Sequence, residues 1–241
     1  MKTIIHLSKD RGHANHGWLN AHHSFSFANW YDPQKIQFGM LRVLNDDIVS
    51  AGKGFGSHPH NDMEIITIIL KGALEHRDNM GNGSVIRPDD VQVMSAGTGV
   101  IHSEFNPSST EDVRLFQLWI IPKEKGIKPS YDQKTFNPDL RKNKVQLLAS
   151  GFNKEGEMYI HQDAAISLAA IDPGQAINYS INKNGNGVYI MVVEGSVEIN
   201  GENLLRRDAI GITGAQSILI KSNGDQDSHK NEILIIEIPM E

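Results

Sequence analysis

Two short histidine motifs constrain the fold of this chain more than any other feature. Residues His58–His60 read His-Pro-His and residues His102–Glu104 read His-Ser-Glu, and each motif adjoins a β-favouring run, Glu64–Leu70 or Val91–Met94. Residues two apart in an extended strand point to the same face, so each motif presents two side chains together. Neighbouring strands lie about 5 Å apart. The sequence therefore predicts that the four side chains converge within a β-sheet structure.

Three imidazoles and one carboxylate form a ligand set that suits first-row divalent metal ions. The predicted metal ligands are His58, His60, His102 and Glu104. These residues fill four positions of an octahedral ion and leave up to two positions open for water, substrate or dioxygen. Iron(II) is the preferred candidate, and nickel, manganese, cobalt, copper and zinc stay open because ligand type alone does not separate them. A core role is common for a lone buried histidine, but two paired motifs favour metal binding.

The residues around these motifs resemble a known family. Gly52, His58–His60 and Glu64 are similar to the first cupin motif, and Gly99–His102 with Asn106 is similar to the second. Four further phrases are typical of pirins: Arg11–Leu19, His23–Phe27, Tyr31–Pro33 and Met94–Glu104. The resemblance is close to the bacterial pirins with quercetin 2,3-dioxygenase activity. It implies a metal-dependent oxidoreductase that opens the heterocycle of flavonols with dioxygen and releases carbon monoxide.

The resemblance also implies roles for the acidic residues. It assigns ligation to Glu104, which we also expect to be the catalytic base for the substrate hydroxyl. Counting alternate residues from His58 places Asp62 and Glu64 on the histidine face, and many cupins use the carboxylate at the position of Glu64 as a ligand. We expect Glu64 to orient an imidazole from outside the ligand set, with direct ligation as the alternative.

The predicted fold class is all-β, with two tandem cupin barrels of the double-stranded β-helix, or jelly-roll, type. Strands alternate with glycine-bearing turns such as Asp78–Gly83, which is the pattern of an antiparallel barrel. An internal repeat relates Lys71–Glu75 to Glu194–Glu198, and Arg87–Val93 to Arg206–Ile212. We therefore expect a metal-binding cupin domain over residues 1–135 and a degenerate cupin domain over residues 136–241.

The repeat predicts that the second barrel has no metal site. Its offsets place Ile181, Lys183, Lys221 and Asn223 at the ligand positions. His161 and His229 are isolated and are expected at the surface. The polar stretch from Lys123 to Lys144 is expected to be a connecting segment, with its basic residues in solvated loops.

The first fifty residues mix histidines and aromatic residues without helical periodicity, and Gly39–Leu44 is expected to form a strand. One cluster has two interpretations, either a pocket for a flat aromatic ligand or packing against the barrel exterior, and we prefer packing. The cluster contains His22, His23, Phe25, Phe27, Trp30 and Tyr31.

Composition excludes several classes of function. The chain has no cysteine, which rules out disulfides and zinc–thiolate sites, and its net charge of −6 disfavours nucleic-acid binding. It has neither an apolar run of the ~20 residues that span a bilayer nor a signal-peptide pattern, so we expect a cytoplasmic protein without membrane contact. The expected partners are a small aromatic substrate and dioxygen.

Other functions remain open from the sequence. Eukaryotic pirins resemble this chain in the same motifs and are regarded as regulatory metal-binding proteins, which act through a protein partner. An isomerase or decarboxylase would use the same open metal positions, and a metal-free binding module is the remaining class. Metal analysis and gas measurements with a flavonol distinguish these classes.

Overall fold

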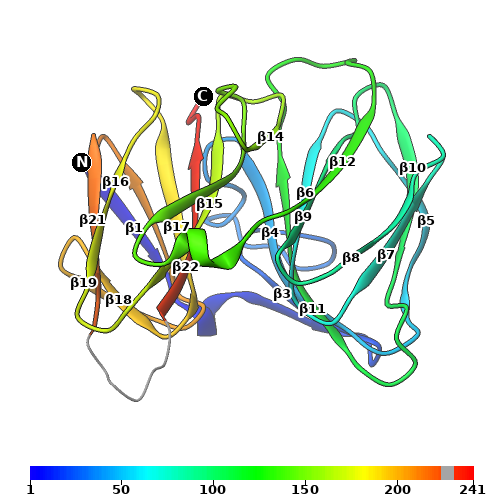
Figure 1. Ribbon diagram of the computed structural model, residues 1–241, viewed down its shortest axis with the longest axis horizontal. Coiled ribbons are helices and arrows are strands. Elements are labelled where there is room, and N and C mark those ends of the chain that lie inside the picture. Colours follow the sequence, from blue (N-terminus) through cyan, green and yellow to red (C-terminus); the bar gives the residue numbers. More distant parts are fainter. Residues whose placement is uncertain (224–230) are drawn as a thin grey trace. The chain divides into compact units, whose positions relative to one another are not determined.

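A computed structural model describes residues 1–223 and 231–241; His229 lies outside this described part. The structure is built almost wholly of strands, and it divides into two compact units (Figure 1). The amino-terminal unit comprises residues 11–136 and 160–162, and the carboxy-terminal unit comprises residues 1–10, 137–159 and 163–241. No helix within the described residues is long and apolar enough to cross a membrane.

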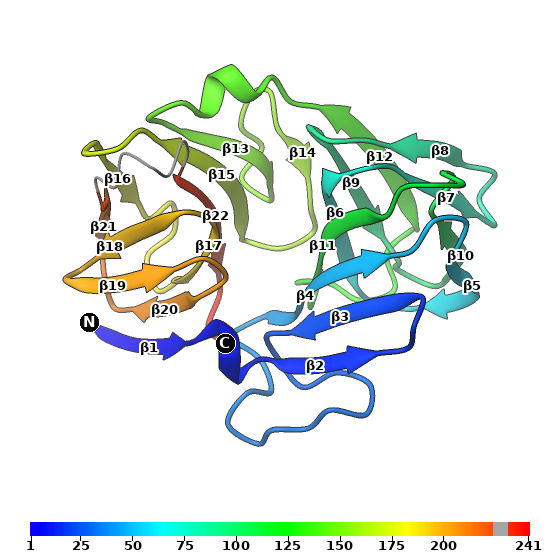
Figure 2. The same cartoon turned by 90° about the horizontal axis from the view of Figure 1, so that it is seen from below.

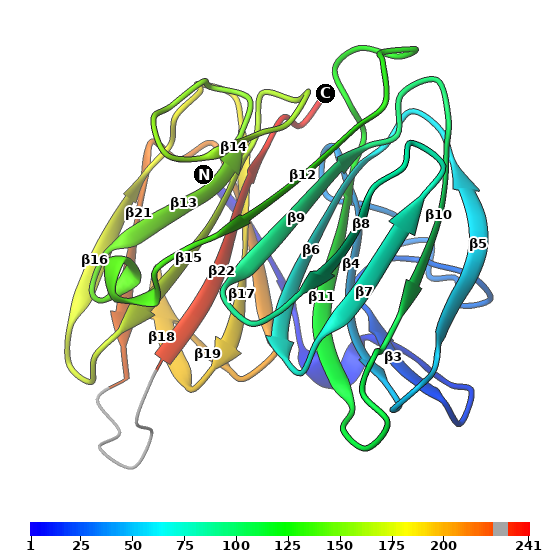
Figure 3. The ribbon, with the colours of Figure 1, turned by 45° about the vertical axis from the view of Figure 1, so that its right-hand side comes forward.

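The amino-terminal unit contains two antiparallel sheets. The larger sheet has seven strands in the order β12-β9-β6-β11-β4-β3-β2, and the smaller has four in the order β5-β10-β7-β8 (Figure 3). The strand bounds are β2 Gly12–Asn15, β3 Leu19–His23, β4 Leu41–Val49, β5 Gly54–His60, β6 Glu64–Lys71, β7 Leu74–Asp78, β8 Gly83–Ile86, β9 Asp90–Ser95, β10 Val100–Phe105, β11 Val113–Ile120 and β12 Ser130–Thr135.

Strand formation here follows from β-branched and aromatic sequence. The run Glu64–Leu70 becomes β6, whose first six residues are all buried, as expected for a central strand covered on both faces. Ile69, Leu74 and Leu115 belong to a buried cluster with Ala21 of β3. Figure 2 shows β2, β3 and β4 side by side at one edge of the larger sheet.

The carboxy-terminal unit repeats this architecture. Its sheets have the orders β1-β20-β17-β22-β15-β13-β14 and β16-β21-β18-β19, and β1 reaches this unit by pairing with β20, which the sequence did not suggest. The bounds are β1 Lys2–His6, β13 Val145–Ser150, β14 Met158–Tyr159, β15 Ala165–Ile171, β16 Ala176–Ser180, β17 Gly187–Glu194, β18 Ser196–Ile199, β19 Glu202–Leu205, β20 Ala209–Thr213, β21 Ser217–Ser222 and β22 Asn231–Ile238, with short 3-10 helices η1 Ser8–Asp10 and η2 Pro138–Arg141. The predicted all-β fold with two tandem barrels is confirmed.

Matching turns make the internal repeat visible. Gly72 and Gly195 have φ angles of 79° and 80° in corresponding hairpin turns. Farther along, the Asp90 carboxylate accepts from Arg87 N and the Asp208 carboxylate accepts from Leu205 N. Asp90 therefore corresponds to Asp208, which is 118 residues farther along the chain. The predicted match of Arg87 with Arg206 implied a separation of 119 residues, one too many.

This shift corrects two positions predicted for the second barrel, Lys221 and Asn223. The other two, Ile181 and Lys183, were also wrong, because they lie beyond the end of β16 and Ile177 occupies the place of His58. Lys221 is exposed, and its Nζ donates to Glu198 at 3.0 Å. The inward positions of β16 and β21 belong instead to one apolar core cluster, which includes Ile177, Tyr179, Ile218 and Ile220. That core has no imidazole, so the barrel interior at this place is packed rather than ligating.

The segment from Lys123 to Lys144 is more structured than expected. It contains β12 and η2, and β12 pairs with β9 along six residues from Ser130 to Thr135. Arg141 is buried beside Glu232, with 3.1 Å between Nε and the carboxylate, so its predicted place in a solvated loop was wrong. His161 is partly buried, and its backbone N donates to Glu64.

Candidate metal site

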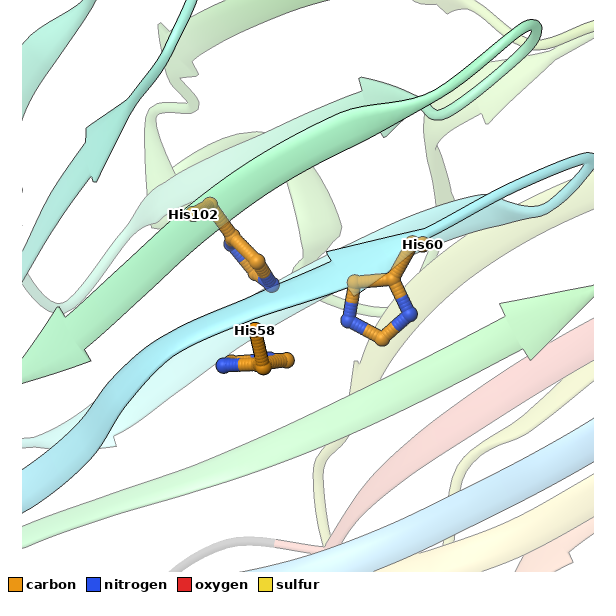
Figure 4. A group of neighbouring side chains, drawn as sticks. All are labelled: His58, His60 and His102. Carbon is orange, nitrogen blue, oxygen red and sulfur yellow. The ribbon is translucent and has the colours of Figure 1, made fainter.

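Two neighbouring strands bring the three predicted histidines together. In the β5–β10 pair His102 lies opposite His58, and His60 lies opposite Val100. The ring centroids are 4.9 Å apart for His58 and His60, 4.4 Å for His58 and His102, and 4.9 Å for His60 and His102. Figure 4 shows the three rings gathered beside these strands.

The ligand atoms of the three histidines have the spacing that one ion requires. They all lie within 4.8 Å of one another. Nitrogen atoms bound to one ion at about 2.1 Å lie roughly 3 to 4 Å apart in octahedral geometry. Only small movements would bring these nitrogens onto a common ion.

Glu104 meets this cluster through His102. The β5–β10 register shifts between His102 and Glu104 because β5 carries an extra residue there, whereas β10 itself alternates regularly and buries both side chains on one face. Glu104 forms a second group with His102 and His76, in which the ligand atoms again lie within 4.8 Å. The predicted four residues therefore form two overlapping groups that share His102.

The unpaired atoms at the site fit a metal ion. His58 Nδ1 donates to the Gly56 carbonyl at 2.7 Å, which leaves Nε2 with its lone pair. His102 Nε2 and Glu104 Oε1 are buried without a hydrogen-bond partner within the described chain. A cation is the natural partner for such atoms, because buried polar groups without partners are costly.

Burial also prepares the imidazoles for a metal. Desolvation and the neighbouring His58 lower the pKa of His60 to about 4. Desolvation and three neighbouring histidines lower the pKa of His102 to about 3. Both rings are therefore neutral near pH 7, and neutral imidazole is the form that binds metal.

Gln117 of β11 fixes the Glu104 carboxylate. Its Nε2 donates to Glu104 Oε2 at 2.9 Å, while its Oε1 accepts from Trp119 Nε1 at 3.1 Å. The Trp119 bond sets which way the amide points. Burial raises the pKa of Glu104 to about 7, against the opposing effect of the Gln117 hydrogen bond.

His76 is a site residue that sequence reasoning missed. It is fully buried on β7, where its Nε2 donates to Asp78 Oδ2 at 3.1 Å and its Nδ1 lies 3.4 Å from His102 Nδ1. Because Nε2 carries the proton of the neutral ring, Nδ1 accepts from His102 and leaves the lone pair on His102 Nε2. The alternation Leu74-x-His76-x-Asp78 was the available signal, since it places His76 on the apolar face of its strand.

Glu64 does not take its predicted role. It belongs to neither group, and its Oε2 accepts from Ser95 Oγ at 2.8 Å and from His161 N at 3.0 Å, rather than from an imidazole. The alternation count failed because Asp62 has a φ of 46°, which breaks the strand between His60 and Glu64. Burial raises the pKa of Glu64.

A cavity of about 250 Å³, here called the metal-side cavity, adjoins the histidines. Asp47 of β4 is 5% exposed on its wall, and its Oδ1 has no hydrogen-bond partner among the described residues. Burial, with the nearby charges of Asp46 and Glu104, raises the pKa of Asp47 to about 8. The full lining is Leu19, Ala21, His23, Phe27, Asn45, Asp47, Phe55, His58, His60, Glu104, Gln117 and Trp119.

The aromatic cluster near the amino terminus lies partly around cavities. His23 and Phe27 line the metal-side cavity, and both also line a second cavity that Trp30 borders. Phe25 is instead in the core, and Tyr31 is 73% exposed. His23, Phe27 and Trp30 therefore pack against their neighbours and also line cavities, so the pocket interpretation stays open for these three residues.

Comparison with known proteins identifies the family. Residues 5–120 match the family described as Pirin, and residues 147–238 match the quercetinase C-terminal cupin domain. A quercetin 2,3-dioxygenase of Escherichia coli strain K12 is 44% identical over 238 residues, which are 98% of this chain and 99% of the relative. This chain belongs to the pirin family.

Two further comparisons place this pirin. A pirin-like protein of Caulobacter vibrioides is 43% identical over 217 residues, which are 90% of the pirin and 93% of the relative. The crystal structure of the bacterial pirin YhhW from Escherichia coli in complex with nickel(II) superimposes with a TM-score of 0.91 at 42% identity, covering 99% of each chain. The pirin therefore shares both barrels with these relatives.

Proposed function

We infer that this pirin is a metal-dependent dioxygenase that cleaves the heterocycle of flavonols such as quercetin and releases carbon monoxide. One observation carries the inference: His58, His60 and Glu104 line one cavity with aromatic walls, and His102 lies in a group with each of them. Glu104 Oε1 is buried there without a hydrogen-bond partner among the described residues. The name of the 44% identical Escherichia coli relative, quercetin 2,3-dioxygenase, supports the substrate.

His58, His60, His102 and Glu104 would hold one divalent first-row ion. Iron(II) is our preferred ion, and the nickel(II) complex of the similar YhhW structure makes nickel the main competitor. When bound, the ion would lower the pKa of the substrate's 3-hydroxyl group and stabilise the resulting anion.

Glu104 is the proposed base for that hydroxyl. Among the described residues its Oε1 has no hydrogen-bond partner, while Gln117 holds its Oε2 at 2.9 Å. Oε1 would therefore serve both roles, as the atom that contacts the ion and as the atom that takes the proton when substrate binds. In the metal-free chain burial raises the pKa of Glu104 to about 7, so this carboxylate takes up a proton more readily than an exposed glutamate does. In the overall reaction both atoms of dioxygen enter the opened product, and one ring carbon leaves as carbon monoxide.

The cavity walls orient the flat substrate. His60 and Trp119 meet edge to face with ring centroids 4.8 Å apart, and Phe27 meets Trp119 edge to face at 5.3 Å. Rings held at such angles form a slot for a planar aromatic molecule. Water is excluded where the slot is apolar, which strengthens the electrostatic effect of Glu104 on the substrate.

The decisive test measures oxygen uptake and carbon monoxide release with quercetin, together with metal content. We expect the wild type to form one carbon monoxide per dioxygen, and Glu104→Gln to lose at least about a hundredfold in kcat if the base role holds. Glu64→Gln is the matched control, because it makes the same change at a buried glutamate outside both groups.

Two results would contradict the proposal. Absence of gas exchange by the metal-loaded wild type removes the dioxygenase function. Unchanged turnover by a fully metal-loaded Glu104→Gln protein removes the base role while leaving the dioxygenase function intact.

A further inference from the structure

A second cavity lies against the metal-side cavity in the amino-terminal unit. Its volume is about 520 Å³. The two cavities adjoin each other, because Leu19, Ala21, His23, Phe27 and Phe55 belong to both linings. The second cavity is otherwise lined by His13, Ala14, His16, Trp18, Ala28, Asn29 and Trp30.

The metal-side cavity is small for a ligand with three rings. Pockets for drug-sized ligands usually measure about 300–1,000 Å³, and the metal-side cavity holds about 250 Å³. A fused two-ring head beside the histidines would occupy most of it. A third ring attached to that head would extend along the residues common to both linings into the adjoining 520 Å³ cavity.

The second cavity is built to receive an aromatic ring. Trp18 and Phe55 meet edge to face with ring centroids 5.2 Å apart, and both line the second cavity. Trp30 is fixed in place because Phe27 and Trp30 exchange backbone hydrogen bonds of 3.0 Å in each direction. Its ring also packs against Gly12, where an added Cβ would lie 2.2 Å from the indole. A ring that is already ordered loses little entropy when a ligand binds.

A polar group at the rim fits the hydroxyls of such a ring. His16 is exposed and lines the cavity. The His13 side chain instead lies on the opposite face of the β2–β3 pair, where its Nε2 is 2.8 Å from Asn20 Oδ1. His13 also stacks on His22 with a centroid distance of 4.6 Å. Imidazole both donates to and accepts from phenolic hydroxyls.

We propose that the second cavity binds the hydroxylated pendant ring of a polyphenol whose fused-ring head lies beside His58, His60 and His102. This assignment rests on the proposed flavonol dioxygenase function, which it deepens by giving the amino-terminal strands β2 and β3 a role in substrate selection. The second cavity, rather than the metal ligands, would then distinguish a flavonol from a smaller hydroxylated heterocycle that lacks the pendant ring.

Three probes and three variants test the proposal. Quercetin has the hydroxylated pendant ring, 3-hydroxyflavone has the ring without hydroxyls, and 3-hydroxychromone lacks the ring. Ala14→Phe fills the second cavity from β2, His16→Ala removes a rim donor, and Tyr31→Ala changes a neighbouring side chain that is 73% exposed and lines neither cavity. Binding is measured on metal-loaded protein without oxygen, and KM and kcat are measured with oxygen.

Ala14→Phe should raise Kd and KM about tenfold for quercetin and 3-hydroxyflavone, because it displaces the ring contacts, and should leave 3-hydroxychromone within about twofold. His16→Ala should weaken quercetin about threefold without affecting 3-hydroxyflavone, as expected for one hydrogen bond. Tyr31→Ala should bind all three probes like the wild type.

The proposal is overturned if Ala14→Phe binds quercetin normally. It is also overturned if Ala14→Phe weakens all three probes equally and His16→Ala leaves quercetin unchanged. If the wild type consumes no oxygen with any probe, the dioxygenase function fails, and the oxygen-free binding comparison still decides the role of the second cavity.

Discussion

Replacing Asp47 with asparagine should make the metal-free protein more stable, by an amount that grows with pH. Burial, with repulsion from Asp46 and Glu104, raises the pKa of Asp47 from 3.8 to about 8. A shift of about 4 units corresponds to ~6 kcal/mol at most. Relaxation and water entry into the adjoining cavity reduce this, so we expect about 2–3 kcal/mol.

The sign of the effect follows from the direction of the shift. Below about pH 4 both the folded and unfolded states hold the proton, and Asp47 contributes nothing. Between about pH 4 and 8 the unfolded state ionises while the folded state keeps its proton, so the free energy of unfolding falls as pH rises. Asp47→Asn does not titrate, so its advantage over the wild type should be near zero at about pH 4 and full by about pH 8.

Tryptophan fluorescence during urea denaturation reports the unfolding of the amino-terminal unit, which contains Asp47. The chain has three tryptophans, and Trp18, Trp30 and Trp119 all lie in the amino-terminal unit. Asp46→Asn is the control, since its carboxylate is on the same strand but faces Arg11 at 3.4 Å. Parallel pH profiles for Asp47→Asn and the wild type between pH 5 and 8 would refute the reasoning.

Two further variants test how the site is held. Gly54→Ala should lower the free energy of unfolding by about 1–3 kcal/mol, because its Cβ would lie 2.2 Å from the Glu104 carbonyl oxygen. Gly56→Ala is the control, since its Cβ would have no atom within 4 Å, and it should melt within about 2 °C of the wild type. Equal melting temperatures for the Gly54→Ala and Gly56→Ala proteins would contradict this reasoning. Gln117→Leu should weaken metal affinity about tenfold in a chelator competition, because Glu104 loses its 2.9 Å hydrogen bond, and an unchanged affinity would show that Gln117 does not position the carboxylate.

The sequence was sufficient to predict the histidine cluster because His58 and His60 lie in one uninterrupted strand, where alternation is reliable. The same rule failed beyond His60, where Asp62 adopts a positive φ. It held for His102 and Glu104, which are both buried on one face of β10 even though the partner strand β5 carries an extra residue at this point. Local alternation predicts only what lies inside a regular strand.

The residues that surround the ligands were harder to predict, because they arrive through nonlocal pairing. His76 reaches His102 only because β7 lies on the other side of β10, with His76 opposite Glu104. The repeat was detectable from two turns, but a one-residue error in its offset placed Lys221 inside a barrel when it lies outside. The positions of His76 and Lys221 both depend on the register between paired strands, which the sequence of one segment does not specify.

A polar row inside the amino-terminal barrel connects the fold to the site. Gln92, Thr67 and Gln117 lie opposite one another on β9, β6 and β11, and each interrupts an apolar run. All of Gln92's side-chain polar atoms, and Thr67 Oγ1, are buried without a hydrogen-bond partner in the described structure, which costs roughly 1–3 kcal/mol per group.

The carboxy-terminal barrel shows that the fold does not need this polar row. The corresponding strands β20, β17 and β22 pair Ile210 with Ile190 and Ile190 with Ile235, and all three isoleucines are fully buried in one core cluster. These three corresponding positions are thus apolar in the carboxy-terminal barrel and polar in the amino-terminal barrel, where Gln117 donates a hydrogen bond to Glu104. The buried polar groups are therefore best explained by the site that they adjoin, because the repeated fold has isoleucine at the corresponding positions.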